Sequence, residues 1–224
     1  MSQTKTKSSD LTILRLGLVD YEKCWQLQRE IHEKVANGDA SNTLIFVEHP
    51  SVYTAGRRTE ITERPQDGTP VIDVDRGGRI TWHGPGQIVG YPIVHLKNQS
   101  DVVGFVRNLE NAIIEVLKEF DLFGISIAGR TGVWLKDETE RKIAAIGVRV
   151  AKGVTMHGFA LNVNPDLNNF NRIIACGLPD VVTTSMATEL NREIKIPEIM
   201  EVLERKMIAA LENVSDNPFA NKVN

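Results

Sequence analysis

The pattern of apolar and polar positions predicts clusters of strands punctuated by three main helices. Apolar residues recur at helical spacing over residues 21–35, 101–123 and 197–211. Asp20 precedes the first helix as an N-cap, and Gly38 follows it as a C-terminal glycine. Alternating or short apolar runs predict strands at residues 11–16, 43–48, 51–55, 71–75, 88–96, 132–135, 142–150 and 154–163. This order is typical of an α+β or mixed α/β fold and not of a regular βαβ repeat.

The chain is long enough for one domain with a sizeable core. It has 224 residues, of which 42% are hydrophobic and 25% are charged, the balance of an ordinary globular protein. Burial of about 70% of the unfolded surface is feasible at this size without a disulfide or a metal. The polar residues 1–10 are expected to form a disordered tail, residues 11–213 a single catalytic domain, and residues 214–224 a loose C-terminal tail.

Charge and cysteine usage narrow the class of protein. A net charge of −3 and a pI near 6.0 argue against a dedicated nucleic-acid binder. The polar N-terminus lacks the apolar stretch of a signal peptide, and no run approaches the roughly 20 apolar residues of a membrane span. We therefore expect a cytoplasmic protein whose two cysteines, Cys24 and Cys176, are free thiols.

Residues 76–91 form the densest candidate site. This segment, RGGRITWHGPGQIVGY, holds five glycines in sixteen residues, with arginine, threonine, tryptophan and histidine between them. Glycine lets a backbone approach a ligand closely, although a pair of hairpin turns is an alternative interpretation. The dinucleotide fingerprint starting at Gly84 fails because Val89 stands where the sixth residue should be glycine, and the chain has no Gly-Lys-Ser/Thr. A strand-loop-strand that lines a substrate is favoured over a phosphate cradle.

Two further segments carry candidate catalytic residues. Cys176 stands between alanine and glycine among loop signals, where a thiol is unhindered, as a nucleophile must be. Lys142 opens a strand of small and apolar residues, where partial desolvation makes a lysine a usable base. The alternatives are a structural cysteine and a lysine that snorkels at a strand end. Cys24, in contrast, lies on an amphipathic helix and is predicted to be a small core residue.

Metal and serine-hydrolase sites are not indicated. The five histidines show no paired ligand spacing, there is no C-x-x-C, and no G-x-S-x-G occurs. His157 begins the strand-like run HGFALNV, and a satisfied structural histidine is the commoner interpretation of such a residue.

Taken together, four segments resemble the octanoyltransferases of lipoate biosynthesis. They are residues 76–91, Lys142 to Gly147, HGFALN at 157–162 and ACGL at 175–178. The resemblance extends over nearly the whole chain and includes EHPSVYT at 48–54. It implies a fold shared with lipoate and biotin protein ligases, in which mixed β-sheets surround an acyl tunnel and helices flank them.

The resemblance also implies a reaction and a site. Octanoate would pass from octanoyl-acyl carrier protein to a lysine ε-amine on the lipoyl domains of 2-oxoacid dehydrogenases or on the glycine cleavage H protein. Cys176 would carry the acyl group as a thioester, with Lys142 completing a Cys/Lys dyad. The acyl-site lining would be Arg76, Gly77, Gly78, Arg79, Ile80, Thr81, Trp82, His83, Ala145, Ile146, Gly147, Gly158, Phe159 and Ala160. We expect His49 or His157 to support the dyad.

This reading needs neither ATP nor a metal, because a thioester donor is already activated. Both carrier proteins are acidic, so docking would fall to local cations, for which the candidates are Arg57, Arg58, Arg64 and Arg79. A monomer is expected. Three alternatives stay open: a ligase that adenylates a free acid, an amidotransferase that moves octanoate between two carriers, and a binding module without turnover.

Overall fold

A computed structural model describes residues 4–8, 11–174 and 181–216 of the chain. One large mixed sheet forms its centre, with the strand order β1-β2-β3-β7-β12-β11-β10-β9 and with β8, β13 and β14 attached at its sides. These strands are β1 (Thr4–Ser8), β2 (Leu11–Leu18), β3 (Asn42–Glu48), β7 (Gln87–Ile93), β8 (His95–Leu96), β9 (Gly124–Ile127), β10 (Arg130–Lys136), β11 (Glu140–Ala151), β12 (Val154–Asn162), β13 (Val182–Thr183) and β14 (Ser215–Asp216). A second sheet has the order β5-β4-β6, with β4 (Val52–Ala55), β5 (Val71–Asp73) and β6 (Thr81–His83).

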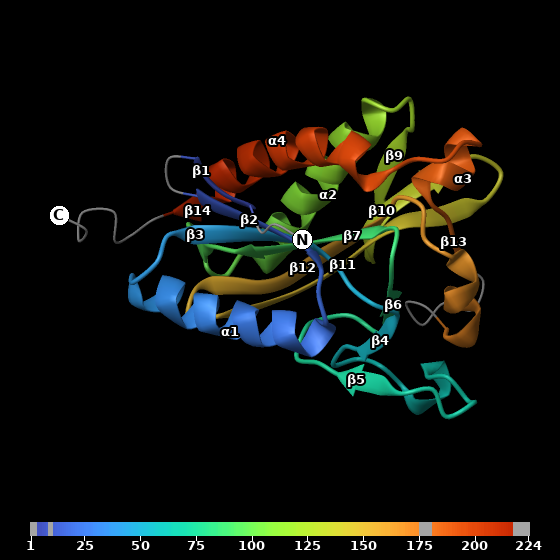
Figure 1. The fold of residues 1–224 in the computed structure, drawn as a ribbon, viewed down its shortest axis with the longest axis horizontal. Helices are drawn as coiled ribbons and strands as arrows, with labels where there is room; N and C mark the ends of the chain where they lie inside the picture. Colours follow the sequence, from blue (N-terminus) through green and yellow to red (C-terminus); the bar gives the residue numbers. More distant parts are fainter. Residues whose placement is uncertain (1–3, 9–10, 175–180, 217–224) are drawn as a thin grey trace.

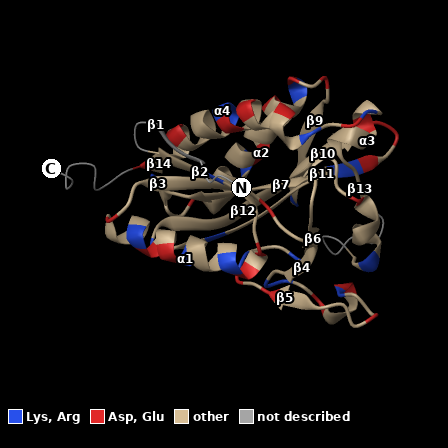
Figure 2. Ribbon diagram, viewed as in Figure 1, with Lys and Arg blue, Asp and Glu red and all other residues tan. Residues whose placement is uncertain are grey.

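Helices cover both faces of the large sheet (Figure 1). Helix α1 (Tyr21–Asn37) lies on one face, and α2 (Val102–Lys118) and α4 (Ile196–Val214) lie on the other. The short elements α3 (Met186–Leu190), η1 (Ile61–Glu63) and η2 (Leu167–Arg172) lie in the connections. Charged residues of both signs are spread along α1 and α4 (Figure 2). The expected fold class, mixed sheets flanked by helices, is confirmed.

The side-chain alternation of β3 divides the core into two halves. Leu44 and Phe46 belong to the cluster beneath α2 and α4, whereas Ile45 and Val47 belong to the cluster beneath α1. Successive residues of a strand point to opposite faces, so a strand covered on both sides is apolar throughout. This is why residues 43–48 read as a continuous apolar run.

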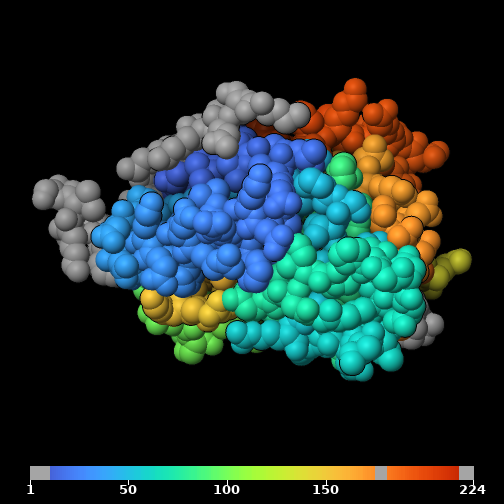
Figure 3. Space-filling view, turned by 60° about the horizontal axis from the view of Figure 1, so that its bottom comes forward, coloured from blue at the N-terminus to red at the C-terminus, as the bar shows by residue number. Residues whose placement is uncertain are grey.

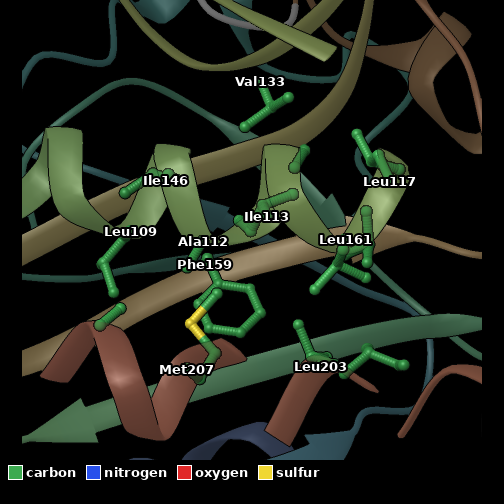
Figure 4. Packing of buried hydrophobic residues seen from close by; sticks show 14 of the residues in the cluster. Leu109, Ala112, Ile113, Leu117, Val133, Ile146, Phe159, Leu161, Leu203 and Met207 are labelled. Atoms are coloured by element: carbon green, nitrogen blue, oxygen red, sulfur yellow. The ribbon is translucent and has the colours of Figure 1, made fainter. Parts of the chain in front are cut away.

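The larger half of the core lies between the sheet and the pair α2 and α4 (Figure 4). Leu109 and Ile113 of α2 and Leu203 of α4 are fully buried against the sheet. Phe159 and Leu161 of β12 reach up to them from the sheet. The opposite side chains of β12, such as Ala160, face α1, and residues 157–160 of this strand also line the cavity described below.

The helix boundaries follow the capping signals in the sequence. The Asp20 side chain accepts a hydrogen bond from Lys23 N, and Gly38 adopts the left-handed conformation with φ of +80°. The third helix was predicted to end at residue 211 and extends to Val214. The second was predicted to reach residue 123 but ends at Lys118, because the backbone turns at Asp121, whose φ is +57°.

Both predicted tails contain short strands. Residues 4–8, assigned by composition to a disordered tail, pair with β2, and Ser215–Asp216 pair with β8. Strand pairing uses the backbone N–H and C=O groups, so a polar segment beside an open strand edge can extend the sheet. Apolar patterning did not show this.

The three-stranded sheet places the glycine-rich segment over the large sheet. Its residues form the front of the molecule next to α1 in the space-filling view (Figure 3). Gly77 N donates to Val148 O at 2.9 Å, which fixes the loop between β5 and β6 on top of β11. The candidate site lies between this loop and the floor that β11 and β12 provide.

Candidate functional site

A cavity of about 280 Å³ lies where the loop between β5 and β6 covers strands β7, β11 and β12. The start of α1 and the turn between β9 and β10 complete its wall. Most of the residues that were expected to line an acyl site do line this cavity. They are Arg76, Gly78, Arg79, Ile80, Thr81, His83, Ala145, Ile146, Gly147, Gly158, Phe159 and Ala160. Lys142 and His157 line the same cavity.

Small residues pair across the floor of the cavity. In the antiparallel register of β11 and β12, Ala145 lies opposite Ala160 and Gly147 lies opposite Gly158. The two alanines leave open space between the strands and the loop. The two glycines are required because neighbouring backbone lies close to them. A Cβ on Gly147 would lie 2.9 Å from Gly77 O, and a Cβ on Gly158 would collide with Gly90 O. The protein's own backbone therefore occupies the space that the glycines free.

The Arg76 guanidinium holds the roof of the cavity in shape. It donates to Gly77 O at 3.0 Å and to Arg79 O at 2.8 Å, which closes the loop on itself. It also donates to the carbonyl and hydroxyl oxygens of Thr54 at 2.8 and 3.0 Å, which ties the loop to β4. Gly56 is required beside it, because a Cβ there would lie 2.6 Å from Gly78 O.

Lys142 is buried on β11, and its ammonium group lies 5.0 Å from the centre of the Trp134 ring. The two residues are directly paired between β10 and β11. An ammonium over an aromatic face is held by the ring quadrupole. Lys142 also anchors the backbone of the chain that follows residue 180, since its carbonyl accepts from Thr184 N at 2.9 Å.

The predicted nucleophile, Cys176, lies outside the described residues. The described chain next to it is held at the cavity on both sides. Ile174 N donates to the carbonyl of Glu63, whose side chain pairs with the cavity residue Arg79. On the other side, Thr183 of β13 pairs with Lys142.

His83 presents an unprotonated nitrogen to the cavity. Its Nδ1 lies 2.7 Å from Gln87 Oε1, and Gln87 Nε2 donates to Asn162 Oδ1 at 2.8 Å. The Gln87 oxygen therefore accepts from His83 Nδ1–H, and Nε2 is the nitrogen with the free lone pair. Burial and then the nearby His49 lower the pKa of His83 to about 3, so the ring is neutral at neutral pH.

His49 lies behind the cavity wall and orients a tyrosine. Its Nδ1 lies 2.6 Å from Val19 O, which can only accept, so the Nδ1 carries the hydrogen. Its Nε2 then accepts from the Tyr91 hydroxyl at 2.9 Å. Tyr21 stacks on His83 with ring centres 5.8 Å apart and meets His49 edge to face. Burial lowers the pKa of His49 and raises the pKa of Tyr91 well above its usual value.

His157 is held by a carboxylate in an uncommon backbone conformation. Its φ is +60°, rare for a residue with a side chain, and its Nε2 lies 2.7 Å from Asp75 Oδ1. Asp75 also pairs with Arg149. The hydrogen bond from His157 lowers the pKa of Asp75, so the carboxylate is ionised and accepts from Nε2–H. Burial lowers the pKa of His157, which favours the neutral ring.

Of the described residues that were expected at the site, three do not line the cavity. Trp82 is buried behind it, donates to Ser51 Oγ at 2.9 Å and packs against Phe170. Gly77 lies on the loop itself, and His49 lies behind the wall. In a three-residue strand such as β6, alternate side chains face opposite sides, so Thr81 and His83 reach the cavity whereas Trp82 does not.

Some cavity residues lie outside every candidate segment that the sequence indicated. They are Tyr21, Gly129, Arg130, Thr131 and Trp134. Val89 and Tyr91 also line the cavity, and they belong to the candidate segment 76–91. The Asp20 N-cap signal places Tyr21 at the first position of α1, but no local pattern shows that this helix end points to β7. The glycine two residues before Trp134 is the one local signal of the hairpin wall.

The predicted docking arginines differ in their partners. Arg64 pairs with Asp73, and Arg79 pairs with Glu60 and Glu63. Arg57 and Arg58 are exposed, and within the described chain no carboxylate pairs with either side chain. Their backbone N–H groups donate to Arg76 O and Gly78 O, each at 3.1 Å.

Neither a metal site nor a membrane-spanning helix is found among the described residues. No three side chains of the histidine, cysteine, aspartate and glutamate types gather there as they would around a metal ion. Among the helices of the described segments, none has the length and apolarity that crossing a bilayer would take.

The model of one protein family matches residues 20–208 and carries the description lipoyl protein ligase A/B catalytic domain. Curated relatives named octanoyltransferase are about half identical to the chain. The one from Salinispora arenicola is 52% identical over 90% of this chain and 96% of its own length. The one from Mycobacterium tuberculosis strain H37Rv is 50% identical over 94% of this chain and 91% of its own length.

Solved structures with the same fold are lipoate and biotin ligases. A bi-partite lipoate protein ligase from Thermoplasma acidophilum aligns with a TM-score of 0.65 at 16% identity, over 88% of this chain and 83% of that chain. A lipoate-protein ligase A bound with ATP gives 0.64 at 13% identity, over 92% and 86%. A biotin protein ligase from Aquifex aeolicus gives 0.52 at 13% identity, over 90% and 69%. At these identities the likeness is one of fold.

Proposed function

The chain belongs to the lipoyl protein ligase A/B catalytic-domain family, and from this premise we propose that it moves octanoate from an acyl carrier protein to a lysine of a lipoyl domain. Relatives about half identical over nine-tenths of the chain are named octanoyltransferase, which supports octanoyl transfer as the reaction. The observation that carries the proposal in the structure is a buried lysine in the wall of a cavity that also has an apolar, alanine-paired floor.

In the proposed first step, Lys142 accepts the proton of the Cys176 thiol and the thiolate attacks the octanoyl carbonyl. The tetrahedral intermediate collapses, the carbon–sulfur bond to the phosphopantetheine breaks, and its sulfur leaves as a thiol with the proton returned by Lys142. A thioester on Cys176 remains. Once protonated, the Lys142 ammonium stabilises the Cys176 thiolate, because a neighbouring cation raises the thiolate fraction of a cysteine.

In the proposed second step, the acceptor lysine amine attacks the Cys176 thioester. The amide bond forms, the amine loses one proton to Lys142 or to a cavity base, and Cys176 leaves with a proton as the thiol. His83 Nε2 supports the second possibility, because it is an acceptor nitrogen on the cavity wall. No adenylation is required, since the donor arrives as a thioester.

The cavity supports an acyl chain of this length class. Val89, Ala145, Ile146, Phe159 and Ala160 supply apolar wall from three adjacent strands. Burial of the methylene groups of octanoate at ~0.8 kcal/mol each would contribute roughly 5 kcal/mol before entropic costs. That is enough to favour octanoate over much shorter acyl groups.

The experiment is a two-stage assay with octanoyl-acyl carrier protein and an apo-lipoyl domain. Without acceptor, intact mass should show one octanoyl group per chain, and peptide mapping should place it on Cys176. Cys176→Ser should abolish net transfer, and Lys142→Met should slow acylation by about 10² to 10⁴-fold. Octanoate found on any other residue would contradict the thioester step.

A ligase that adenylates free octanoate is the second candidate, favoured by the fold it shares with a ligase bound to ATP. Replacing the thioester donor by octanoate, ATP and magnesium separates the two. The proposal predicts no lipoyl-domain product under these conditions and full transfer when the thioester is restored. Product from free octanoate would favour the ligase.

A further inference from the structure

Among the described residues that line the cavity, the charged groups are all cationic. Among its described lining residues are five basic side chains and no carboxylate. These five are Arg58, Arg76, Arg79, Arg130 and Lys142. The chain as a whole carries a net charge of −3, so this cation excess is local. A cavity walled in this way favours an anionic group on the ligand that enters it.

Four of the five cations already contact other groups of the protein. Arg79 is paired with Glu60 and Glu63, and Arg130 with Glu140. Arg130 also lies over Trp134, 4.2 Å from the ring centre. The other two, Arg76 and Lys142, are buried and hold the roof loop and the proposed dyad, as described above.

Arg58 differs from these four. Its residue is exposed and lines the cavity, so its side chain stands at the mouth. Its backbone is fixed, because Arg58 N donates to Gly78 O at 3.1 Å and Thr59 N donates to Gly56 O at 3.0 Å. Within the described part of the chain, its guanidinium makes no hydrogen bond or ion pair. A free guanidinium on a fixed backbone at a cavity mouth suits an anion that enters with the substrate.

We propose that Arg58 binds the phosphodiester of the donor's phosphopantetheine arm where that arm passes into the cavity. The inference rests on the proposed function and names a subsite of the same reaction. A donor whose thioester reacts inside the cavity must thread its arm through the mouth, and the phosphodiester is the arm's charged group. The planar guanidinium fork matches two phosphate oxygens at once. The other anions available to Arg58 are carboxylates on the surface of the carrier protein.

Three donors distinguish these anions. S-octanoyl-pantetheine lacks the phosphate, S-octanoyl-4′-phosphopantetheine has it without a protein, and octanoyl-acyl carrier protein has both. Arg58→Gln should raise KM about five- to tenfold for the two phosphorylated donors and leave kcat within about twofold, as expected for loss of an exposed charge-assisted hydrogen bond. KM for S-octanoyl-pantetheine should not change. Arg58→Lys should recover part of the loss, because it restores the charge without the fork.

Arg205→Gln is the matched control. The substitution removes the same charge from α4. In the wild type, Arg205 pairs with Glu119 at 2.9 Å and lies outside the cavity lining. The variant should leave KM unchanged for all three donors. Thermal unfolding of both variants should match the wild type, since both arginines are exposed.

The outcomes are separable from a failure of the proposed function. If the wild-type chain transfers octanoate from none of the three donors, both the function and this inference fall. If it transfers, the inference is overturned by an Arg58→Gln effect on all three donors equally, which would mean altered cavity shape. It is also overturned by an effect on the carrier protein alone, which would mean surface carboxylates, or by no effect.

Discussion

The side chain of Lys142 crosses the bare α-carbon of Gly132. A methyl group on Gly132 would collide with the backbone oxygen of Ala144 and would lie 2.6 Å from Lys142 Cε and 3.2 Å from its Nζ. The φ of Gly132 is +118°, and its N–H donates to the buried carboxylate of Glu110 at 2.8 Å. The glycine therefore leaves open the path along which the lysine reaches the face of Trp134.

Gly132→Ala should push the Ala144 carbonyl of β11 and the Lys142 side chain away from β10. It should lower kcat by about 10²-fold, because a misplacement of about 1 Å in a reacting group has effects of that size. KM for the donor should change little. Gly68→Ala is the control: Gly68 also has positive φ, +81°, but a Cβ there meets nothing within 4 Å. Both variants carry the backbone strain, so equal loss of kcat in the two would show that strain alone is responsible.

The alanine pair on the cavity floor should set the length of the acyl chain. Ala145→Leu would fill the space opposite Ala160. Excluding two methylene groups at ~0.8 kcal/mol each should lower kcat/KM for octanoyl donors roughly 15-fold, with a smaller loss for hexanoyl donors. The check is kcat/KM across donors of four to ten carbons.

Ala144→Leu serves as the contrast to that variant. Ala144 directly precedes Ala145 on β11 and is fully buried in the core beneath α2 and α4. The added volume should lower the free energy of unfolding by about 1–3 kcal/mol without changing chain-length preference. An unaltered preference in Ala145→Leu would count against the floor as the acyl site.

Local patterns predicted most of the elements and the glycine-rich segment over the cavity, whereas the family resemblance supplied the other expected lining residues. The period of α1, its cap residues and the glycine-rich loop all act within a few residues. Which side of a strand faces the cavity is not set by a local pattern. Trp82 stands between two cavity residues yet points away, because the pairing of β6 with β4 decides which face is covered.

Contacts between distant segments could not be predicted from the sequence pattern either. Tyr21 and Tyr91 meet the same histidine from α1 and β7, and the register of the large sheet brings them together. Gly158 shows the same limit. It was expected to line an acyl site, and the structure shows that the space beside its α-carbon is taken by Gly90 O. No local pattern reports a neighbour about 70 residues away.

The hydrogen bond from Tyr91 to His49 Nε2 should stabilise the fold measurably. Tyr91→Phe leaves that buried nitrogen without a donor, which costs about 1–3 kcal/mol of unfolding free energy. In a His49→Leu background the same change should cost much less, since the acceptor is gone. Urea unfolding of the four proteins gives the coupling. Equal costs in both backgrounds would refute it.

Stability should fall as the solution is acidified from pH 6.5 to pH 5. Burial holds the pKa of His83 at about 3 and lowers the pKa of His49 and His157, whereas an unfolded histidine has a pKa near 6.5. These groups stay neutral in the folded chain and bind protons on unfolding. Their contribution to the free energy of unfolding is therefore fully present above about pH 6.5 and is lost as the pH falls towards the folded pKa values.

Each such histidine adds at most ~1.4 kcal/mol per pH unit to the slope of unfolding free energy, so the three together give between about 1.4 and 4. Carboxylates with ordinary pKa values stay ionised across this window and add little. Urea titrations at pH 8, 6.5, 5.8 and 5 measure the slope. His83→Gln should reduce it by about one proton, because glutamine does not titrate while its amide can still occupy the site beside Gln87. A slope in this variant equal to that of the wild type would mean that His83 binds the same number of protons in the folded and the unfolded chain, which would contradict a pKa lowered by burial.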